Sequence, residues 1–557
     1  MLQRIQSLGF SMATLTLAAC SSPDSAAQDG ADCEGAKCDA VDDTTDPDAR
    51  VCFGVRGNGQ LIFAHFGSLA RIYENTGRMF WGASGGSSGS ITTFLVDSIQ
   101  TNKVLPDCDG SACSEAEAAN RAALLLKSLQ GYVEVLGETD EAVALLQLGP
   151  LAQSIQTEGL SALALEDAEA ARESLLTLLG SDDLADIIND ELVDTITNSP
   201  DPAFHVQDVA QALSKIAAFD ATDDTIFVRP GIIDFDKLAE KLGRIANFYA
   251  GYGPYDAAGM IRFFDQCATP GTGMAWDELS GLAIEDGGTC GELFKGLVTE
   301  YRTALLADED AFPKRIDDIV GSEMHALIST SVLENDAVDQ WERAFADYKN
   351  ADAHTLEVDF DDVGFGYFGS EADLAATEAN YEGYDDLKTD KFRALGPVTW
   401  RTALTYSPAE PGLTRAQEID DSRVSAGGWS DLHPTLVLNN LGCDEVIYVT
   451  RRGATSDFVT HDRADPEATP RGVATLLNMS DEDWRLLYDL LSPSAYDLSV
   501  READSVWCTD WNQSSPADIS GTIDDAYNAL QVTDSEFWSR SYDNNGDGAG
   551  IAGCGPL

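Results

Sequence analysis

Short apolar runs alternate with longer segments of helical periodicity along most of this chain. Brief apolar or β-branched runs are typical of strands. They predict strands at residues 51–55, 324–333, 364–369, 398–404 and 446–450, and the end of a buried strand at 79–81. Apolar residues that recur every three or four positions predict helices over 61–72, 88–99, 208–218 and 236–250. Strands that alternate with helices predict a three-layer α/β domain with a mainly parallel central sheet.

Changes in composition divide the chain into four parts. Residues 1–20 include a short apolar run, and residues 21–50 are small and acidic, which predicts a flexible tether. The α/β domain is expected over 51–459, with a large Ala-, Leu- and Glu-rich helical insertion at about 114–221. Residues 460–557 are acidic and are expected to form a C-terminal extension packed on the domain.

The first twenty residues have the form of a secretory signal peptide. Arg4 lies in a short basic segment, and the apolar run at 8–19 is too short to span a bilayer. The run ends in Leu17-Ala18-Ala19-Cys20, which resembles the lipobox of bacterial lipoproteins. The resemblance implies that Cys20 carries a lipid anchor to the membrane, and that the protein is located at the bacterial outer membrane or cell surface. The alternative is an ordinary signal peptide in which Cys20 has no special role.

Charge and cysteine content narrow the function classes and the compartment. The 95 acidic residues outnumber the 35 basic ones and give a net charge of −60, which argues against a nucleic-acid partner. Eleven cysteines are present, and the ten that remain without Cys20 are an even number suited to disulfides in an oxidising compartment. Spacing allows small local loops at Cys33/Cys38 and Cys108/Cys113 and a longer one at Cys267/Cys290. The candidates to tie the chain ends to the core are Cys52, Cys443, Cys508 and Cys554. The sequence does not determine the pairing, and no cysteine set has a convincing zinc spacing.

The main candidate for chemistry lies in residues 81–91. Residues 85–89 (GGSSG) fit the G-x-S-x-G nucleophile elbow, in which a serine occupies a strained turn between a strand and a helix. This register makes Ser87 the candidate nucleophile, with glycines where the backbone angles and the close approach of a helix exclude a Cβ. Residues 82–86 (GASGG) also satisfy the pattern and keep Ser84 as an alternative, although the helix would then begin in a poor helix-forming segment.

Two glycine-containing loops are candidates for binding. Residues 57–59 precede a predicted helix, and the backbone N–H groups of Gly57, Asn58 and Gly59 would suit a phosphate or a developing oxyanion. They do not complete a dinucleotide fingerprint, because Ile62 occupies the third glycine position. Residues 543–548 (DNNGDG) match the start of a calcium loop, but Cys554 stands where the bidentate glutamate is required.

The order of these motifs resembles the patatin-like phospholipase family. Residues 57–59 look like that family's oxyanion loop, and residues 85–91 resemble its serine elbow. Residues 403–412 (ALTYSPAEPG) resemble the segment containing S-x-A-x-P, and 440–447 resemble the closing helix-turn-strand. The agreement runs in order across residues 51–450, apart from the insertion, and implies a three-layer patatin-like sandwich.

The family performs its reaction with a serine–aspartate dyad, and the aspartate position differs in this chain. The family's D-G-G/A motif falls on residues 426–428 (AGG), so Ala426 stands in place of the aspartate. Serine is a weak nucleophile without a base. Three hypotheses remain open: Asp431 is a displaced base, His433 is a base oriented by Asp431 or another carboxylate, or the protein is a non-catalytic relative. Residues 286–288 (DGG) are a literal match, but they precede the S-x-A-x-P segment and are predicted to form a loop turn.

The resemblance implies a lipid acyl hydrolase of the phospholipase A or esterase type, acting on a lipid or phospholipid substrate without a metal or other cofactor. Ser87 would be the nucleophile, and the N–H groups of Gly57, Asn58 and Gly59 would form the oxyanion hole. Leu61 occupies the place where the family usually has an arginine or lysine. The alternative is a catalytically inactive patatin-like surface binding protein, which Ala426 favours.

Overall fold

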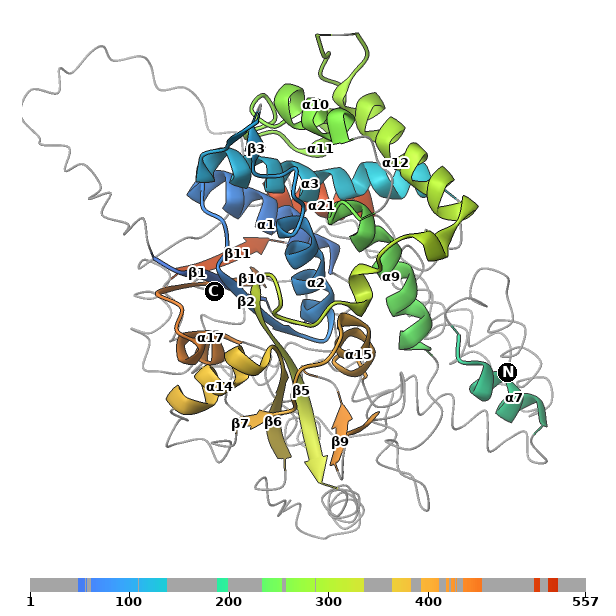
Figure 1. Ribbon diagram of the computed structural model, residues 1–557, viewed down its shortest axis with the longest axis vertical. Coiled ribbons are helices and arrows are strands. Elements are labelled where there is room, and N and C mark those ends of the chain that lie inside the picture. The colour runs from blue at the N-terminus through green and yellow to red at the C-terminus, as the bar shows by residue number, and fades with distance from the viewer. Residues whose placement is uncertain are drawn as a thin grey trace, which may run out of the picture. The chain divides into compact units, whose positions relative to one another are not determined.

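The computed structural model (Figure 1) describes about half of the chain, all of it within the unit Asp48–Leu557, which is separate from the unit Met1–Pro47. The described residues are 49–55, 57, 62–108, 110–137, 188–198, 233–252, 257–285, 287–334, 363–381, 392–409, 417–419, 422–425, 427, 434–452, 505–510 and 519–528.

A mainly parallel sheet forms the centre of the fold. Its strands follow the order β11-β10-β1-β2-β5-β6-β7. The five strands from β11 to β5 run parallel, β6 is antiparallel to β5, and β7 is parallel to β6. Their bounds are β1 Val51–Val55, β2 Gly82–Gly86, β5 His325–Glu334, β6 Val363–Phe368, β7 Phe392–Ala394, β10 Glu445–Arg452 and β11 Ser505–Asp510. Two short strands, β8 (Gln417–Ile419) and β9 (Ser422–Ser425), pair with each other, and β9 pairs with β5.

Helices cover both faces of the sheet. Successive strand residues point to opposite faces, and buried residues on both faces pack against helices. Phe53 of β1 packs in the cluster that includes α1 (Phe63–Thr76) and α2 (Ser88–Gln100). Its neighbour Cys52 packs in a second cluster with α14 (Glu371–Asn380) and α17 (Thr435–Leu441). Figure 1 shows these two groups of helices on opposite sides of the strands. The prediction of a mixed α/β domain with a mainly parallel sheet is confirmed.

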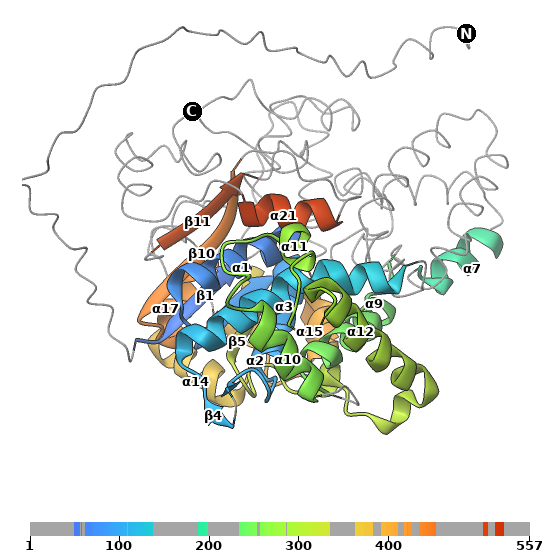
Figure 2. The ribbon, with the colours of Figure 1, turned by 90° about the horizontal axis from the view of Figure 1, so that it is seen from above.

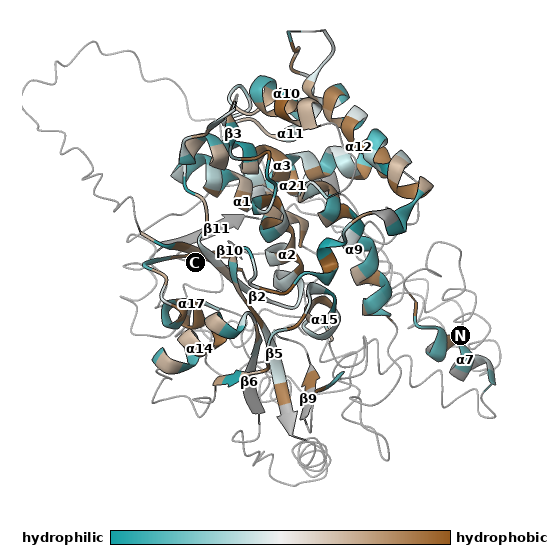
Figure 3. Ribbon diagram, viewed as in Figure 1, coloured by the Kyte–Doolittle hydropathy of each residue, from teal (hydrophilic) through white to brown (hydrophobic). Residues whose placement is uncertain are grey.

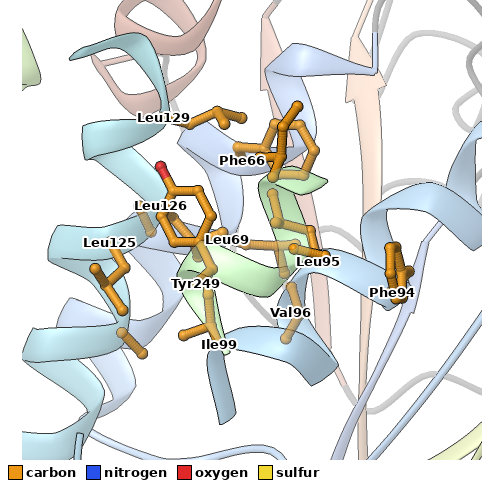
Figure 4. Packing of buried hydrophobic residues seen from close by; sticks show 14 of the residues in the cluster. Phe66, Leu69, Phe94, Leu95, Val96, Ile99, Leu125, Leu126, Leu129 and Tyr249 are labelled. Atoms are coloured by element: carbon orange, nitrogen blue, oxygen red, sulfur yellow. The ribbon is translucent and has the colours of Figure 1, made fainter. Parts of the chain in front are cut away.

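The larger core lies where α1 and α2 meet α3 (Glu115–Leu136) and α9 (Phe235–Tyr249). Figure 4 shows Leu69 of α1, Ile99 of α2 and Leu125 of α3 converging with Tyr249, all of them buried. The helix α3 therefore belongs to this core, although its residues fall in the range in which an insertion was expected. Helices at the rim, such as α12 (Cys290–Ala307), carry both hydrophobic and hydrophilic residues (Figure 3), and the buried ones recur at helical spacing.

Two segments from the last hundred residues join this domain. β11 extends the sheet beside β10, and α21 (Ile519–Asn528) lies across α1 (Figure 2). The two helices approach so closely at Gly67 that a Cβ there would lie 2.1 Å from the carbonyl oxygen of Ile523. Beside this contact Lys127 Nζ donates to Glu74 Oε1 at 2.6 Å, and both side chains are almost completely buried.

Three disulfides are formed within the described residues: Cys52–Cys443, Cys108–Cys113 and Cys267–Cys290. The first joins β1 to the segment before β10 across 391 positions of sequence. The expectation of disulfides is therefore confirmed, and Cys108/Cys113 and Cys267/Cys290 pair as their spacing indicated. Cys33, Cys38 and Cys554 lie outside the described residues.

Two predicted strands were wrong. The second strand is Gly82–Gly86, whereas residues 79–81 were expected to be its end. A Cβ at Gly82 would lie 3.1 Å from Cys52 Sγ, and the strand has no apolar side chain larger than that of Ala83 to indicate it in the sequence. Residues 398–404 were expected to be a strand, but α15 (Trp400–Tyr406) begins there because the Thr399 side chain accepts the Thr402 N–H and caps the helix. The predicted helix at 208–218 lies outside the described residues. Within the part of the chain that is described, no helix is long and apolar enough to cross a membrane.

Candidate active site

The turn between β2 and α2 has the geometry of a nucleophile elbow. Ser87 follows the last residue of β2 and precedes the first residue of α2, with φ 53° and ψ −124°. It is the one non-glycine residue with positive φ among those described. An L-residue adopts this conformation only when its surroundings enforce it, and such strain is concentrated at functional sites. Ser87 is partly exposed, and its hydroxyl does not cap α2.

The glycines on either side of Ser87 are required by close backbone contacts. A Cβ at Gly85 would lie 2.7 Å from the carbonyl carbon and oxygen of Gly89, so the first turn of α2 rests directly on the end of β2. A Cβ at Gly86 would lie 2.2 Å from Ser329 Oγ. The G-x-S-x-G spacing therefore follows from the packing of this turn, as the motif requires.

Ser84, the alternative nucleophile, does not occupy the turn. It lies within β2, is completely buried, and donates its hydroxyl to the carbonyl oxygen of Leu327 at 2.6 Å. A buried hydroxyl held in the sheet cannot meet a substrate carbonyl. The register that places Ser87 at the elbow is the one that the structure adopts.

The loop after β1 lies at the same end of the sheet as the Ser87 turn, the end where the parallel strands finish. β1 and β2 are parallel neighbours, so both finish at this end. A Cβ at Gly57 would lie 3.1 Å from the carbonyl oxygen of Gly86 and 3.4 Å from Ser87 Cβ, which places the Gly57 backbone beside the elbow. Asn58 and Gly59 lie outside the described residues. The N-terminus of α2 lies at the elbow as well, and the positive end of the helix dipole favours negative charge there.

The chain that follows β9 arrives at the elbow from the other side. β2 pairs with β5 as far as Ser329, opposite Gly86. β6 pairs along one side of β5 over residues 328–333. β9 must therefore pair on the other side, beyond the point where the pairing with β2 ends, and it does so from Ser331 onward. Gly427 therefore lies directly against β5, where a Cβ on it would be 2.1 Å from the carbonyl oxygen of Ser329. It also lies against Gly86, since a Cβ on Gly86 would be 3.0 Å from the Gly427 carbonyl carbon.

A serine outside the predicted site connects these segments. Ser407, at the C-terminal end of α15, is buried, and its hydroxyl accepts the backbone N–H of Ser87 at 2.9 Å. The same hydroxyl donates to the carbonyl oxygen of Ser329 at 2.7 Å. The Ser407 carbonyl accepts the Gly427 N–H at 2.9 Å. The only signal in the sequence was that Ser407 is the serine of the S-x-A-x-P segment.

The remaining predicted site residues are not among those described. Asp431, His433 and Ala426 lie outside the described residues, as does Cys20. The described ends of their segment, Gly427 and Pro434, lie against Gly86 and Gly54 respectively. Residues 287 and 288 form a glycine turn, with φ of 86° and 92°, before α12. Within the described part of the chain, no group of three His, Cys, Asp or Glu residues could hold a metal ion.

Comparisons with known proteins leave the family of this chain open. No family model matches the sequence, and no curated protein matches it. One solved structure, that of VipD from Legionella pneumophila, matches with a TM-score of 0.24 and 10% sequence identity, over 90% of this chain and 71% of that one. A likeness of this degree carries no conclusion about fold or function.

Proposed function

We propose that this protein is a serine hydrolase of the patatin-like type, which cleaves carboxylic esters of lipids with Ser87 as the nucleophile. The observation that carries the proposal is the backbone conformation of Ser87, φ 53° and ψ −124°, in a turn from a parallel strand into a helix. Strain of this kind costs of order 1–3 kcal/mol and persists only where the surrounding structure maintains it. In an ordinary Gly/Ser loop, we would expect the positive φ to fall on a glycine, which adopts it without steric cost, rather than on a serine.

The reaction would proceed through an acyl-enzyme. Ser87 Oγ attacks the acyl carbonyl carbon, its proton passes to the base, and the alcohol portion leaves with that proton. A water molecule, deprotonated by the same base, then attacks the acyl-enzyme; the bond to Ser87 Oγ breaks, Oγ takes the proton from the base, and the fatty acid is released. The oxyanion would be held by backbone N–H groups from the loop that begins at Gly57, with Asn58 and Gly59, and by the N-terminus of α2.

Asp431 is the base that we propose, with His433 as the alternative. Both lie between Gly427, which contacts Gly86, and Pro434, which packs against Gly54. Asp431 follows Gly427 by four residues, a span that covers at most roughly 14 Å even when fully extended. The segment that carries both candidates is therefore held at the elbow at its Gly427 end and against β1, the strand next to β2, at its Pro434 end.

The contact of Gly427 with Gly86 also favours the rival function, a patatin-like binding protein without catalysis. It supports the alignment of residues 426–428 with the family's D-G-G/A motif, because this glycine lies at the nucleophile turn. In that alignment the residue expected to be the base is Ala426. The rival protein would retain the elbow and bind a lipid or another acyl ligand without cleaving it.

A fluorophosphonate probe distinguishes the two functions. We expect the probe to label the wild-type protein at Ser87 and to leave Ser87→Ala unlabelled, and we expect hydrolysis of a chromogenic fatty-acid ester to be lost in the same variant. Ser84→Ala is the matched control, since it removes a buried hydroxyl from β2 and should keep the labelling. Absence of labelling in a folded wild-type protein would contradict the enzyme and favour the binding protein.

We also propose that Cys20 anchors the protein by a lipid to the outer membrane, on the basis of the lipobox resemblance alone. Metabolic labelling with an alkyne-tagged fatty acid tests this in a bacterial host. The full-length protein should incorporate the label and partition with outer-membrane fractions, whereas Cys20→Ala should do neither. Incorporation by Cys20→Ala would show that the anchor lies elsewhere.

A further inference from the structure

We propose that Ser407 is a positioning residue for the candidate nucleophile: its hydroxyl fixes the strained Ser87 turn, and its carbonyl fixes the segment that leads to the candidate base. The inference rests on the proposed function, but the contact itself can be tested without any activity.

The first step concerns the Ser87 N–H group. The pairing of β2 with β5 ends at Gly86, so the partly buried Ser87 N–H needs another acceptor. A backbone N–H that is buried without an acceptor costs about 1–3 kcal/mol, which is the upper limit here. Ser407 Oγ supplies the acceptor at 2.9 Å. The bond is made while Ser87 has its unusual backbone angles, so it stabilises the strained conformation relative to any relaxed one that would move the N–H away from Ser407.

The second step concerns how the hydroxyl itself is oriented. A hydroxyl has one proton to donate, and Ser407 donates it to the carbonyl oxygen of Ser329 at 2.7 Å. The lone pairs are thereby directed toward the Ser87 N–H. Since Ser329 lies opposite Gly86 in the paired strands, the hydroxyl joins the turn to the neighbouring strand at the point where strand pairing stops.

The third step concerns the Gly427 segment. The Gly427 N–H donates to the Ser407 carbonyl at 2.9 Å, and the backbone of Gly427 lies against Gly86 and Ser329. Ser407 is thus hydrogen-bonded to the nucleophile turn through its side chain and to the candidate base segment through its main chain. Its own N–H donates to Ala403 within α15, which holds it on a helix rather than on a loop.

The experiment compares Ser407→Ala, Ser407→Thr and Ser84→Ala. Ser84 is a matched control because it too is a buried serine whose hydroxyl donates to a β5 carbonyl, that of Leu327, but it does not bond to the Ser87 turn. In the proposed role, Ser407→Ala should raise the hydrogen-exchange rate of the peptide that contains Ser87 by about tenfold or more, whereas Ser407→Thr and Ser84→Ala should leave it near the wild-type rate.

The second readout is the second-order rate of labelling by the fluorophosphonate probe, measured on samples that are folded by circular dichroism. Ser407→Ala should label about ten- to hundredfold more slowly than wild type, because small displacements of reacting groups cost this much, and Ser407→Thr should recover most of the rate. Unchanged exchange in Ser407→Ala overturns the proposal. Raised exchange with a labelling rate no lower than that of Ser84→Ala shows a structural role only and overturns the positioning role. If the wild-type protein does not label at all, the proposed function fails, while the exchange data still decide whether Ser407 holds the turn.

Discussion

Gly85 and Gly89 meet backbone to backbone across the Ser87 turn. A Cβ on Gly85 would lie 2.7 Å from the carbonyl carbon and oxygen of Gly89 and 3.0 Å from its Cα. Backbone atoms cannot move aside as the end of a flexible side chain can. The first turn of α2 therefore packs directly against the end of β2, and no residue larger than glycine fits at position 85. The orientation of Ser87 depends on this contact.

Substitution of Gly85 should impair both folding and reactivity. We expect Gly85→Ala to destabilise the protein by about 1–3 kcal/mol, as overpacking does, and to suppress labelling of Ser87 by a fluorophosphonate. Gly296→Ala in α12 is the control, because a Cβ there meets nothing within 4 Å and alanine favours the helix by roughly 0.8–1.0 kcal/mol. Urea denaturation and labelling rates measure the two effects. Normal labelling of Gly85→Ala would show that the close contact does not define the elbow.

The base can be identified by moving it. If Asp431 is the base, Asp431→Asn should slow Ser87 labelling by about 10²- to 10⁴-fold, the usual contribution of a general base, while His433→Asn should have a much smaller effect. The double variant Ala426→Asp/Asp431→Asn should recover part of the rate, because position 426 precedes Gly427, which lies against the elbow. A larger loss in His433→Asn than in Asp431→Asn would assign the base to the histidine instead.

The sequence was most informative where the chemistry of single residues determines the backbone. The first strand at 51–55 and the strand that begins near residue 446 are β-branched or apolar runs, and both are found as β1 and β10. The helix start near Ser88 followed from the glycine motif and is found at that residue. The Ser87 elbow was thus predictable, because the close backbone contacts of this turn require glycine and so leave a recognisable motif in the sequence.

The features that the sequence did not predict depend on residues that are distant in the chain. β2 is composed only of Gly, Ala and Ser, since it lies so close to its neighbours that larger side chains do not fit, and no hydrophobic period marks it. Ser407 is 320 positions from Ser87, so only the folded sheet reveals that the two are in contact. The strand predicted at 398–404 failed because one threonine cap outweighs a mixed apolar pattern.

Substitutions of Asp97 and Arg315, which form a buried ion pair, should have strongly non-additive effects on the free energy of unfolding. Both side chains are completely buried, and Asp97 also accepts the Trp400 indole N–H and the Met324 N–H. Burial raises the pKa of Asp97 to about 6, against the opposing effect of Arg315. Asp97→Leu and Arg315→Met should each cost about 3–5 kcal/mol, since each leaves one buried partner uncompensated, and the double variant should cost much less than their sum.

Urea denaturation of the four proteins in this cycle gives the coupling energy. The exposed pair of Lys237 and Asp190 is the reference, because 83% of the Asp190 side chain is exposed and such pairs contribute only about 0–1 kcal/mol. Additive losses at Asp97 and Arg315 would show that the two side chains act independently.

Protonation of Asp524 should make the docking of α21 depend on pH. Its carboxylate accepts the N–H groups of Trp276 and Asp277. Burial raises its pKa from 3.8 to about 6, and the charges of Asp277 and Asp525 act in the same direction, while the two N–H bonds lower it. Between about pH 4 and pH 6 the folded protein therefore retains a proton that the unfolded chain has released. Stability from this group is highest below pH 4 and falls as the pH rises to about 6.

Comparison with Asp524→Asn isolates this contribution. The amide oxygen can still accept an N–H but does not titrate, so the stability of the wild type relative to the variant should fall from pH 4 to pH 6 and stay level above pH 6. Asp525→Asn should keep this dependence and shift it to lower pH, because the Asp525 charge helps to raise the pKa of Asp524. Urea denaturation across this range, followed by tryptophan fluorescence, measures the difference. A constant difference between wild type and Asp524→Asn would mean that the pKa of Asp524 is the same in the folded and unfolded protein, and that the two N–H bonds of the α11 helix (Trp276–Ser280) offset its burial.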